Sequence, residues 1–290
     1  MGLVHPRGRL EGITPLDFMN YYHCSILFVR WLSPLVWVAI MACCYVVVSA
    51  RADHRCVPSA HRGEHTRASG NSIEAIRAAA GIPYIEIDIR VTADNELVLF
   101  HDRRLSSTNV RGGDRLLGQP ISSLSREDLN LIRLPDGSRI PKLRMVLREV
   151  QGGSGMLMLD IKSASPRDYT RVMGEVEEVG AESHVVVQCP TKAILQFMRS
   201  RYPKVAVLAR AHAPAEVESL LEHSPEYVQV DHDWGLERSV GLIHAKGARV
   251  VVKTLKPGTD QPVTWRQVCG AGVDVVLTDR SREFLASDDR

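Results

Sequence analysis

Residues 82–102 read IPYIEIDIRVTADNELVLFHD, and this stretch carries both a fold signal and a chemical signal. Its apolar run Tyr84–Val91 alternates isoleucines with the acids Glu86 and Asp88, a period-two pattern that predicts a β-strand. Two residues apart on a strand, the two acids project from the same face. A buried carboxylate is costly without a cation beside it, so the pattern indicates a site for a hard cation.

Outward from this stretch, strand-like runs alternate with segments of helical spacing, which predicts βαβ crossovers and a parallel sheet. Asp94-Asn95 is expected to turn the chain between two runs that no helix separates. Residues 105–143, rich in Gly and Pro, are expected to form an excursion over the active face with a short helix near 126–131. We therefore predict a (β/α)8 TIM barrel over residues 56–287 with one extra hairpin strand, the runs being Cys56–Ala60, Tyr84–Val91, Glu96–Phe100, Met156–Ile161, His184–Gln188, Val205–Ala209, Tyr227–Val230, Arg249–Lys253 and Val273–Leu277.

Composition excludes several classes of protein. The 290 residues carry a formal net charge of +2 and no stripe of Lys and Arg, which argues against nucleic acid as a partner. The six cysteines show no C-x-x-C spacing, so neither a zinc site nor a disulfide framework is expected, although one bridge between lone cysteines stays open. No protein partner is inferable.

The N-terminal part of the chain is a separate unit. Residues 31–50 form an uncharged, apolar run of twenty residues after a leader at 1–30. The run predicts either a transmembrane anchor, through which the protein would meet the membrane, or the core of a signal peptide. Both readings place the predicted barrel outside the cytoplasm, anchored if the run is retained and secreted or periplasmic if it is cleaved.

Two further segments bring chemistry to the predicted strand ends. His61-Arg62-Gly63 follows the first run, and His101-Asp102 follows the hairpin strand. In α/β folds the strand ends hold the active site. Paired imidazoles can move a proton in each direction, and arginine is suited to binding a phosphate. Together with Glu86 and Asp88, these residues predict a metal-assisted phosphodiester hydrolase.

The residues 57–285 resemble the glycerophosphodiester phosphodiesterase family, within the PLC-like phosphodiesterase superfamily. The matching segments, in order, are AHRGEHTRASGNSIEAI, YIEIDIRVTADNELVLFHDRRLSST, Ile140-Pro141-Lys142-Leu143, Leu159-Asp160-Ile161-Lys162 and Gly272-Val273-Asp274 with Leu277-Thr278-Asp279. The resemblance implies that His61 and His101 are the catalytic pair. It also implies one divalent cation, Ca²⁺ or Mg²⁺, held by Glu86, Asp88 and Asp160, and a phosphate held by Arg62 and Lys162. From the residues alone, Lys162 could instead pair with Asp160 or extend into solvent.

The chain departs from the family pattern at two places. Gly70 stands where the family commonly has a glutamate that completes the polar network beside the metal, so we expect weaker metal binding or an altered substrate preference. Asn71 is kept and is expected to cap its helix while facing the site. Lys253 stands where many members have tryptophan, and it could contact an anionic head group. Asn71 and Lys253 are therefore the candidate substrate-pocket residues.

Three functions compete at this point. The first is hydrolysis of a small-molecule or lipid-derived glycerophosphodiester to glycerol phosphate and an alcohol. The second is phospholipase D-like cleavage of lysophospholipid or sphingolipid head groups, which the aspartate at 160 also suits. The third is an inactive barrel that binds phosphorylated ligands, which only Gly70 favours and the histidines and acids oppose.

Overall fold

The computed structural model describes residues 55–151, 153 and 155–287. The predicted leader and the predicted anchor or signal core, with its hydrophobic helix, lie outside these residues. Within the part that is described, no helix has the length and apolar character needed to cross a membrane.

Eight parallel strands close into a barrel within the described residues, which confirms the predicted TIM barrel. Each strand pairs with the next, and the pairing of Ala60 with both Ile85 and Thr278 joins the first strand to the second and to the last. The strands are short and apolar, as the sequence pattern predicts. In barrel order they are β1 (Val57–Ala60), β2 (Tyr84–Val91), β4 (Met156–Ile161), β5 (Val185–Cys189), β6 (Ala206–Arg210), β7 (Tyr227–Asp231), β8 (Arg249–Lys253) and β9 (Val275–Thr278).

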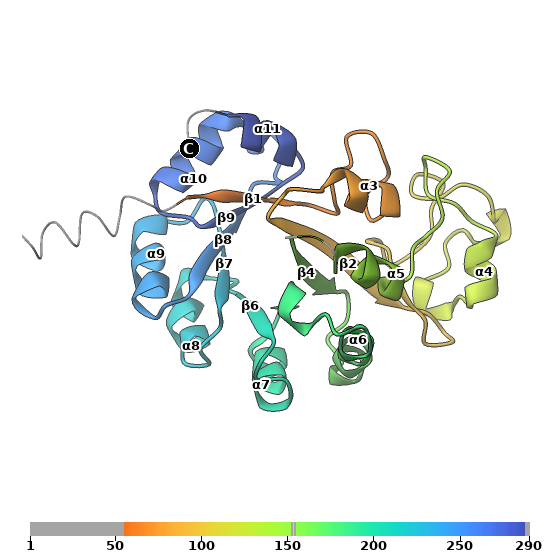
Figure 1. Ribbon diagram of the computed structural model, residues 1–290, viewed down its shortest axis with the longest axis horizontal. Coiled ribbons are helices and arrows are strands. Elements are labelled where there is room, and N and C mark those ends of the chain that lie inside the picture. The colour runs from red at the N-terminus through yellow and green to blue at the C-terminus, as the bar shows by residue number, and fades with distance from the viewer. Residues whose placement is uncertain (1–54, 152, 154, 288–290) are drawn as a thin grey trace, which may run out of the picture. The chain divides into compact units, whose positions relative to one another are not determined.

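Helices follow the strands and cover the outside of the barrel (Figure 1). Their buried faces pack on the outward-facing strand residues in one continuous core, of which Ile87 on β2 is a fully buried member. The helices are α3 (Ile73–Ala78), α5 (Leu143–Val150), α6 (Pro166–Val179), α7 (Lys192–Arg201), α8 (Val217–Leu221), α9 (Leu236–Ala245), α10 (Pro262–Gly270) and α11 (Ser281–Ala286), with 3₁₀ turns η3 (Glu182–His184) and η4 (Pro214–Glu216).

A ninth strand and the excursion lie to one side of the barrel. Strand β3 (Leu97–Leu99) runs antiparallel to β2 after a turn in which Asn95 has a φ of 67°, so the expected hairpin is present. The chain at 105–143 then forms η1 (Asp114–Leu116), η2 (Ile121–Ser123) and α4 (Arg126–Asn130) around a small apolar core of its own. Figure 1 shows this excursion beside β2, away from α7 to α10.

The barrel interior is filled at one end and open at the other. Near the amino ends of the strands, Tyr84 and Tyr227 share a hydrogen bond of 3.1 Å, and Arg249 donates to Tyr84 at 2.8 Å. Apolar side chains such as Met158 and Leu208 form the next interior layer. Above them, at the carboxyl ends, the inward positions carry polar and charged residues, so this end holds the cavity.

One disulfide joins Cys56, which precedes β1, to Cys269 in α10, with a Cα–Cα distance of 5.5 Å. The bridge that the sequence left open is therefore present, and Cys189 is a buried free thiol.

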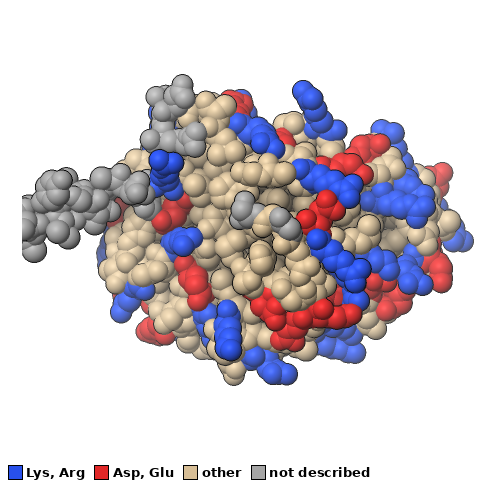
Figure 2. All heavy atoms as spheres, viewed as in Figure 1, with Lys and Arg blue, Asp and Glu red and all other residues tan. Residues whose placement is uncertain are grey.

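Over the face shown in Figure 2, Lys and Arg side chains are interspersed with Asp and Glu.

Candidate active site

A cavity of about 400 Å³ opens at the carboxyl ends of the barrel strands. It brings together residues that the sequence places up to 218 positions apart. Eight of the nine predicted site residues line it, and the ninth, Asn71, lies directly behind it. The lining residues are His61, Arg62, His65, Glu86, Asp88, His101, Asp160, Lys162, Gln188, Arg210, Gln229, Lys253, Leu255, Lys256, Leu277 and Asp279.

Three carboxylates form a cluster on one wall. Glu86 and Asp88 point inward from β2, and the strand register places Asp160 of β4 directly beside Asp88. Carboxylate oxygens of all three lie within 4.8 Å of one another. Lys162 reaches into the cluster, with its Nζ 2.7 Å from Asp88 Oδ1 and 2.5 Å from Asp160 Oδ2. The ion pair that the sequence left as an alternative for Lys162 is therefore formed.

Asp88 is held in place from behind. Asn71 Nδ2 donates to Asp88 Oδ2 at 2.7 Å, and its Oδ1 accepts from the Asp88 backbone N–H at 3.0 Å. Arg62 Nε lies 3.2 Å from the same oxygen. Asn71 does not cap α3 as predicted, because Ser72 is the N-cap and accepts from Ala75 N, which frees the Asn71 amide for the acid.

The charges on this wall fit a hard cation. Burial and the neighbouring Asp88 and Asp160 raise the pKa of Glu86, and no side-chain cation of the described chain pairs with it. Burial would also raise the pKa of Asp88, but Lys162 and Asn71 outweigh it and lower that pKa. Burial opposes the charge of Lys162, whereas the two aspartates raise its pKa. Glu86 is thus a buried carboxylate without a paired cation, and it lies beside two further carboxylates. Three such oxygen ligands are a donor set that Ca²⁺ or Mg²⁺ satisfies.

His61 faces the cavity with a carboxylate behind it. Its Nδ1 lies 2.6 Å from Asp279 Oδ1, and the same oxygen lies 3.4 Å from His65 Nε2. Burial lowers the pKa of His61, while the hydrogen bond to Asp279 works in the opposite direction. A carboxylate bound to Nδ1–H fixes the tautomer and leaves Nε2 as the reactive nitrogen.

His101 has an equivalent partner. Its Nδ1 lies 2.8 Å from Asp102 Oδ1, and Asn109 from the excursion donates to Asp102 Oδ2 at 2.7 Å. Arg90 holds the His101 backbone carbonyl with two hydrogen bonds. Both histidines thus have Nδ1 occupied by an aspartate.

The loop after β1 positions Arg62 through a tight backbone turn. Arg62 has a φ of 57° and Gly63 a φ of 83°, both in the left-handed region. A Cβ at Gly63 would lie 2.7 Å from the backbone of Ala75, so only glycine lets the loop pack on α3. The close packing turns the Arg62 backbone N–H to Glu86 Oε2, at 3.2 Å.

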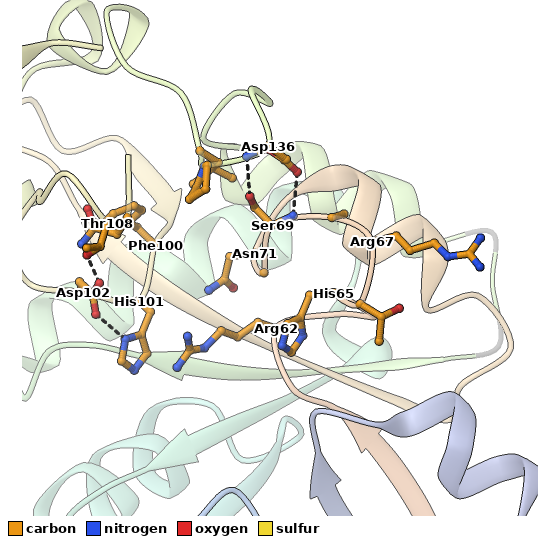
Figure 3. A pocket seen from close by; sticks show the side chains of 16 residues that line it. Arg62, His65, Arg67, Ser69, Asn71, Phe100, His101, Asp102, Thr108 and Asp136 are labelled. Atoms are coloured by element: carbon orange, nitrogen blue, oxygen red, sulfur yellow. Dashed lines mark hydrogen bonds and ion pairs between the residues drawn. The ribbon is translucent and has the colours of Figure 1, made fainter. Parts of the chain in front are cut away.

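A second hollow, a groove of about 600 Å³, adjoins the cavity between this loop and the excursion. The two share Arg62, His65 and His101. In Figure 3 the Arg62 guanidinium points toward His101, and Ser69 and Asp136 join the two walls. Gly70 lines the groove, and a Cβ there would meet Arg62 Cβ at 3.1 Å.

Several residues of the site were not predicted from sequence. Asp102 and Asp279 stand inside quoted motifs, but nothing local indicates that they orient histidines. His65, Arg210, Gln188 and Gln229 have no pattern at all, because an isolated polar residue at the end of an apolar run is a common strand boundary. Only the closed barrel brings them to one cavity.

The fold and the site together define a TIM-barrel protein with a candidate cation site beside two carboxylate-backed histidines. The model of the "Glycerophosphoryl diester phosphodiesterase family" matches residues 61–283, and the chain belongs to this family.

One curated protein and two solved structures illustrate what the chain is similar to. The Bacillus subtilis (strain 168) protein YhdW, named as a glycerophosphodiester phosphodiesterase, is 25% identical over 246 residues, which cover 79% of this chain and 96% of that one. A crystal structure from Galdieria sulphuraria named for the same activity has a TM-score of 0.71 at 22% identity, with 80% and 98% of the two chains covered. An Oleispira antarctica phosphodiesterase, solved in complex with the product sn-glycerol-3-phosphate, has a TM-score of 0.66 at 20% identity and covers 80% and 97%.

Proposed function

We propose that this protein hydrolyses glycerophosphodiesters to glycerol phosphate and an alcohol, with one divalent cation. The observation that carries the proposal is the cavity in which two histidines, each with an aspartate on Nδ1, stand beside three clustered carboxylates. Family membership supports the same reaction, and the Oleispira antarctica relative holds the product sn-glycerol-3-phosphate.

Glu86, Asp88 and Asp160 would hold the cation. The all-oxygen donor set suits Ca²⁺ or Mg²⁺ better than zinc. When bound, such an ion supplies positive charge against the charge that develops on the phosphoryl oxygens. Arg62 and Lys162 would bind the same oxygens, Arg62 through its planar guanidinium and Lys162 as a point charge.

His61 and His101 would transfer the protons. One imidazole takes the proton of the attacking group, a neighbouring substrate hydroxyl or water, and the other donates a proton to the leaving alkoxide. The aspartates on Nδ1 keep each Nε2 available for this step and stabilise the imidazolium that forms.

A two-substrate assay tests the proposal. Glycerol phosphate release from glycerophosphocholine and choline release from lysophosphatidylcholine are measured with Ca²⁺, with Mg²⁺ and with a chelator. We expect metal-dependent release from the first substrate and its loss in His101→Ala. Choline release from lysophosphatidylcholine alone would favour the phospholipase D-like reaction. Activity on neither substrate, with no metal bound, would favour the inactive binding barrel.

We also propose that the barrel works outside the cytoplasm. The Cys56–Cys269 disulfide supports this, since such bonds persist in oxidising compartments. The apolar run at 31–50 supports it as an anchor or as a signal core. Cell fractionation with N-terminal sequencing distinguishes membrane-bound, cleaved and cytoplasmic protein, and the last result would contradict the proposal.

A further inference from the structure

The wall of the cavity opposite the acid cluster is basic. Arg210 at the end of β6 and Lys253 at the end of β8 both line it, on strands that flank β7. Among the described residues, neither side chain forms an ion pair with a carboxylate, whereas Lys256 at the rim pairs with Asp233 at 2.8 Å. Burial lowers the pKa of Lys253, the nearby Arg210 and Lys162 lower it further, and Asp231 and Asp160 oppose the shift. The two cations therefore lie close together, and neither has a carboxylate in ion-pair contact.

A buried amide lies between them. Gln229 points inward from β7, is 4% exposed and lines the cavity. Its Oε1 has no hydrogen-bond partner within the described residues. A buried acceptor without a donor is costly, so this position fits a ligand hydroxyl or ammonium group.

The placement of charge along the cavity lining points to a second anion. Apart from Lys256, the cavity is lined by four basic side chains, Arg62, Lys162, Arg210 and Lys253, and by four acids, Glu86, Asp88, Asp160 and Asp279. A divalent cation at the acid cluster would leave two positive charges in excess among these lining side chains, and Asp231 at the end of β7, which is not a lining residue, offsets one of them. One phosphodiester carries one negative charge, and its two non-bridging oxygens would be bound by Arg62, Lys162 and the cation, which leaves Arg210 and Lys253 on the far wall for another anionic group.

We propose that Arg210 and Lys253 form a subsite for a second anionic group of the substrate, with Gln229 accepting a hydrogen bond from a hydroxyl or ammonium group of the same alcohol. The substrate class is then a glycerophosphodiester whose alcohol carries a further phosphate or carboxylate. This inference rests on the proposed function and deepens it, because it names the alcohol that the site selects.

Paired substrates test the subsite. Glycerophosphoglycerol and bis(glycerophospho)glycerol differ by a second phosphodiester, and glycerophosphoethanolamine and glycerophosphoserine differ by a carboxylate. We expect kcat/KM to favour the more anionic member of at least one pair roughly tenfold or more, because hydrogen bonds to charged groups are the strong ones. The pair that shows the preference identifies phosphate or carboxylate as the second group. Equal kcat/KM within both pairs, after the twofold statistical factor for two phosphates, would overturn the subsite and leave the proposed function intact.

Substitutions of the two basic residues test whether they cause the preference for the more anionic substrate. Lys253→Met and Arg210→Met are each expected to reduce the ratio of kcat/KM within the preferred pair to near one, mainly through KM. Lys204→Met is the matched control, since it removes one positive charge from an exposed position ahead of β6, at the other end of the barrel. An equal loss in the control would show a general charge effect and overturn the proposal.

A binding measurement separates this inference from the catalytic one. In the His101→Ala protein loaded with Ca²⁺ or Mg²⁺, dissociation constants for the same pairs are measured by calorimetry without turnover. Tighter binding of the more anionic member, lost in His101→Ala/Lys253→Met, supports the subsite even if the wild type hydrolyses none of these compounds. Equal dissociation constants would overturn it.

Discussion

Asp279 and Asp102 are the residues that turn two histidines into an oriented pair. Each accepts a hydrogen bond from the Nδ1–H of its histidine. Asp279 lies directly after β9, and Asp102 is the residue next to His101. A neutral imidazole has two tautomers, and only an occupied Nδ1 keeps Nε2 free for proton transfer. The two aspartates therefore set the protonation pattern on which the proposed reaction depends.

Asp279→Asn is expected to lower kcat about 10²- to 10⁴-fold, the range of a positioned acid or base. The hydrogen bond that His61 donates to Asp279 raises the His61 pKa against the lowering effect of burial, so its loss lowers that pKa further. With His61 in the role of base, for which the imidazole must be neutral, the acidic limb of the pH–rate profile should move to lower pH.

The matched control is Asp274→Asn, which alters a similar pair, His244 Nε2 with Asp274 Oδ2 at 2.8 Å, ahead of β9. Its pH–rate profile should keep the wild-type acidic limb. A limb that stays in place or moves upward in Asp279→Asn would remove His61 from the role of base.

Gly70→Glu tests the departure from the family pattern. The new Cβ would lie 3.1 Å from Arg62 Cβ and 3.3 Å from Arg62 Cδ, so the arginine stem must shift by a few tenths of an ångström. The added charge should tighten cation binding by about 1 kcal/mol, roughly fivefold, while the displaced arginine raises KM.

Gly70→Gln separates the two effects, because it brings the same bulk without the charge. We expect it to raise KM and to leave the cation dissociation constant, measured by calorimetry, at the wild-type value. Tighter cation binding in both variants would rule out charge as the cause.

At the scale of elements, the loop after β1 and the excursion form one wall. Asp136 Oδ2 accepts from Ser69 N at 2.7 Å, and Ser69 Oγ accepts from Asp136 N at 3.2 Å. Burial opposes the charge of Asp136, but the bonds from Ser138 and Ser69 hold its pKa at about 2. A depressed pKa means that the contribution to stability is complete above the unfolded value of 3.8 and is lost as the pH falls toward 2.

Asp136→Ala should loosen this wall at neutral pH. We expect KM to rise about fivefold, with a smaller change in kcat. This factor corresponds to the loss of about 1 kcal/mol, the contribution of one hydrogen bond. Hydrogen exchange should increase at 66–71 and 134–138. Glu127→Ala, an exposed acid of the same excursion, is the control, and equal effects of both variants would contradict the link between the loop and the excursion.

The strands could be predicted from sequence because each is a short apolar run between turn residues. Such a run is the pattern typical of a parallel strand that is buried on both faces. The acid pair on β2 could be predicted because its spacing is local. The partners of the histidines could not, since Asp279 lies 218 residues from His61 and meets it only through barrel closure. The contact of Ser69 with Asp136 in the groove wall could not be predicted either, because it depends on how the excursion folds around its apolar core.

At the scale of the whole molecule, the disulfide ties the beginning of the barrel to its last helices. Cys56 and Cys269 are 213 residues apart, and both lie away from the strand ends that hold the cavity. Cross-linking distant residues restricts the unfolded chain more than the folded one. The bond is therefore expected to act on stability and not on the chemistry.

Cys56→Ser/Cys269→Ser should lower the free energy of unfolding by about 2–5 kcal/mol. Urea unfolding followed by circular dichroism measures this, with kcat at 25 °C as the second readout. The kcat of the folded variant should match the wild type, and a reducing agent should destabilise the wild type but not the variant. A variant as stable as the oxidised wild type would show that the bond contributes nothing.

The position of this bond also decides what a protease can do. Because it joins residues 56 and 269, nearly all of the barrel sequence is a covalent ring. A single cut in any surface loop within the ring, including the excursion, opens the ring without releasing a fragment. Such a nicked molecule would run as one species on a non-reducing gel and as two on a reducing gel, and its barrel could stay assembled around an intact cavity.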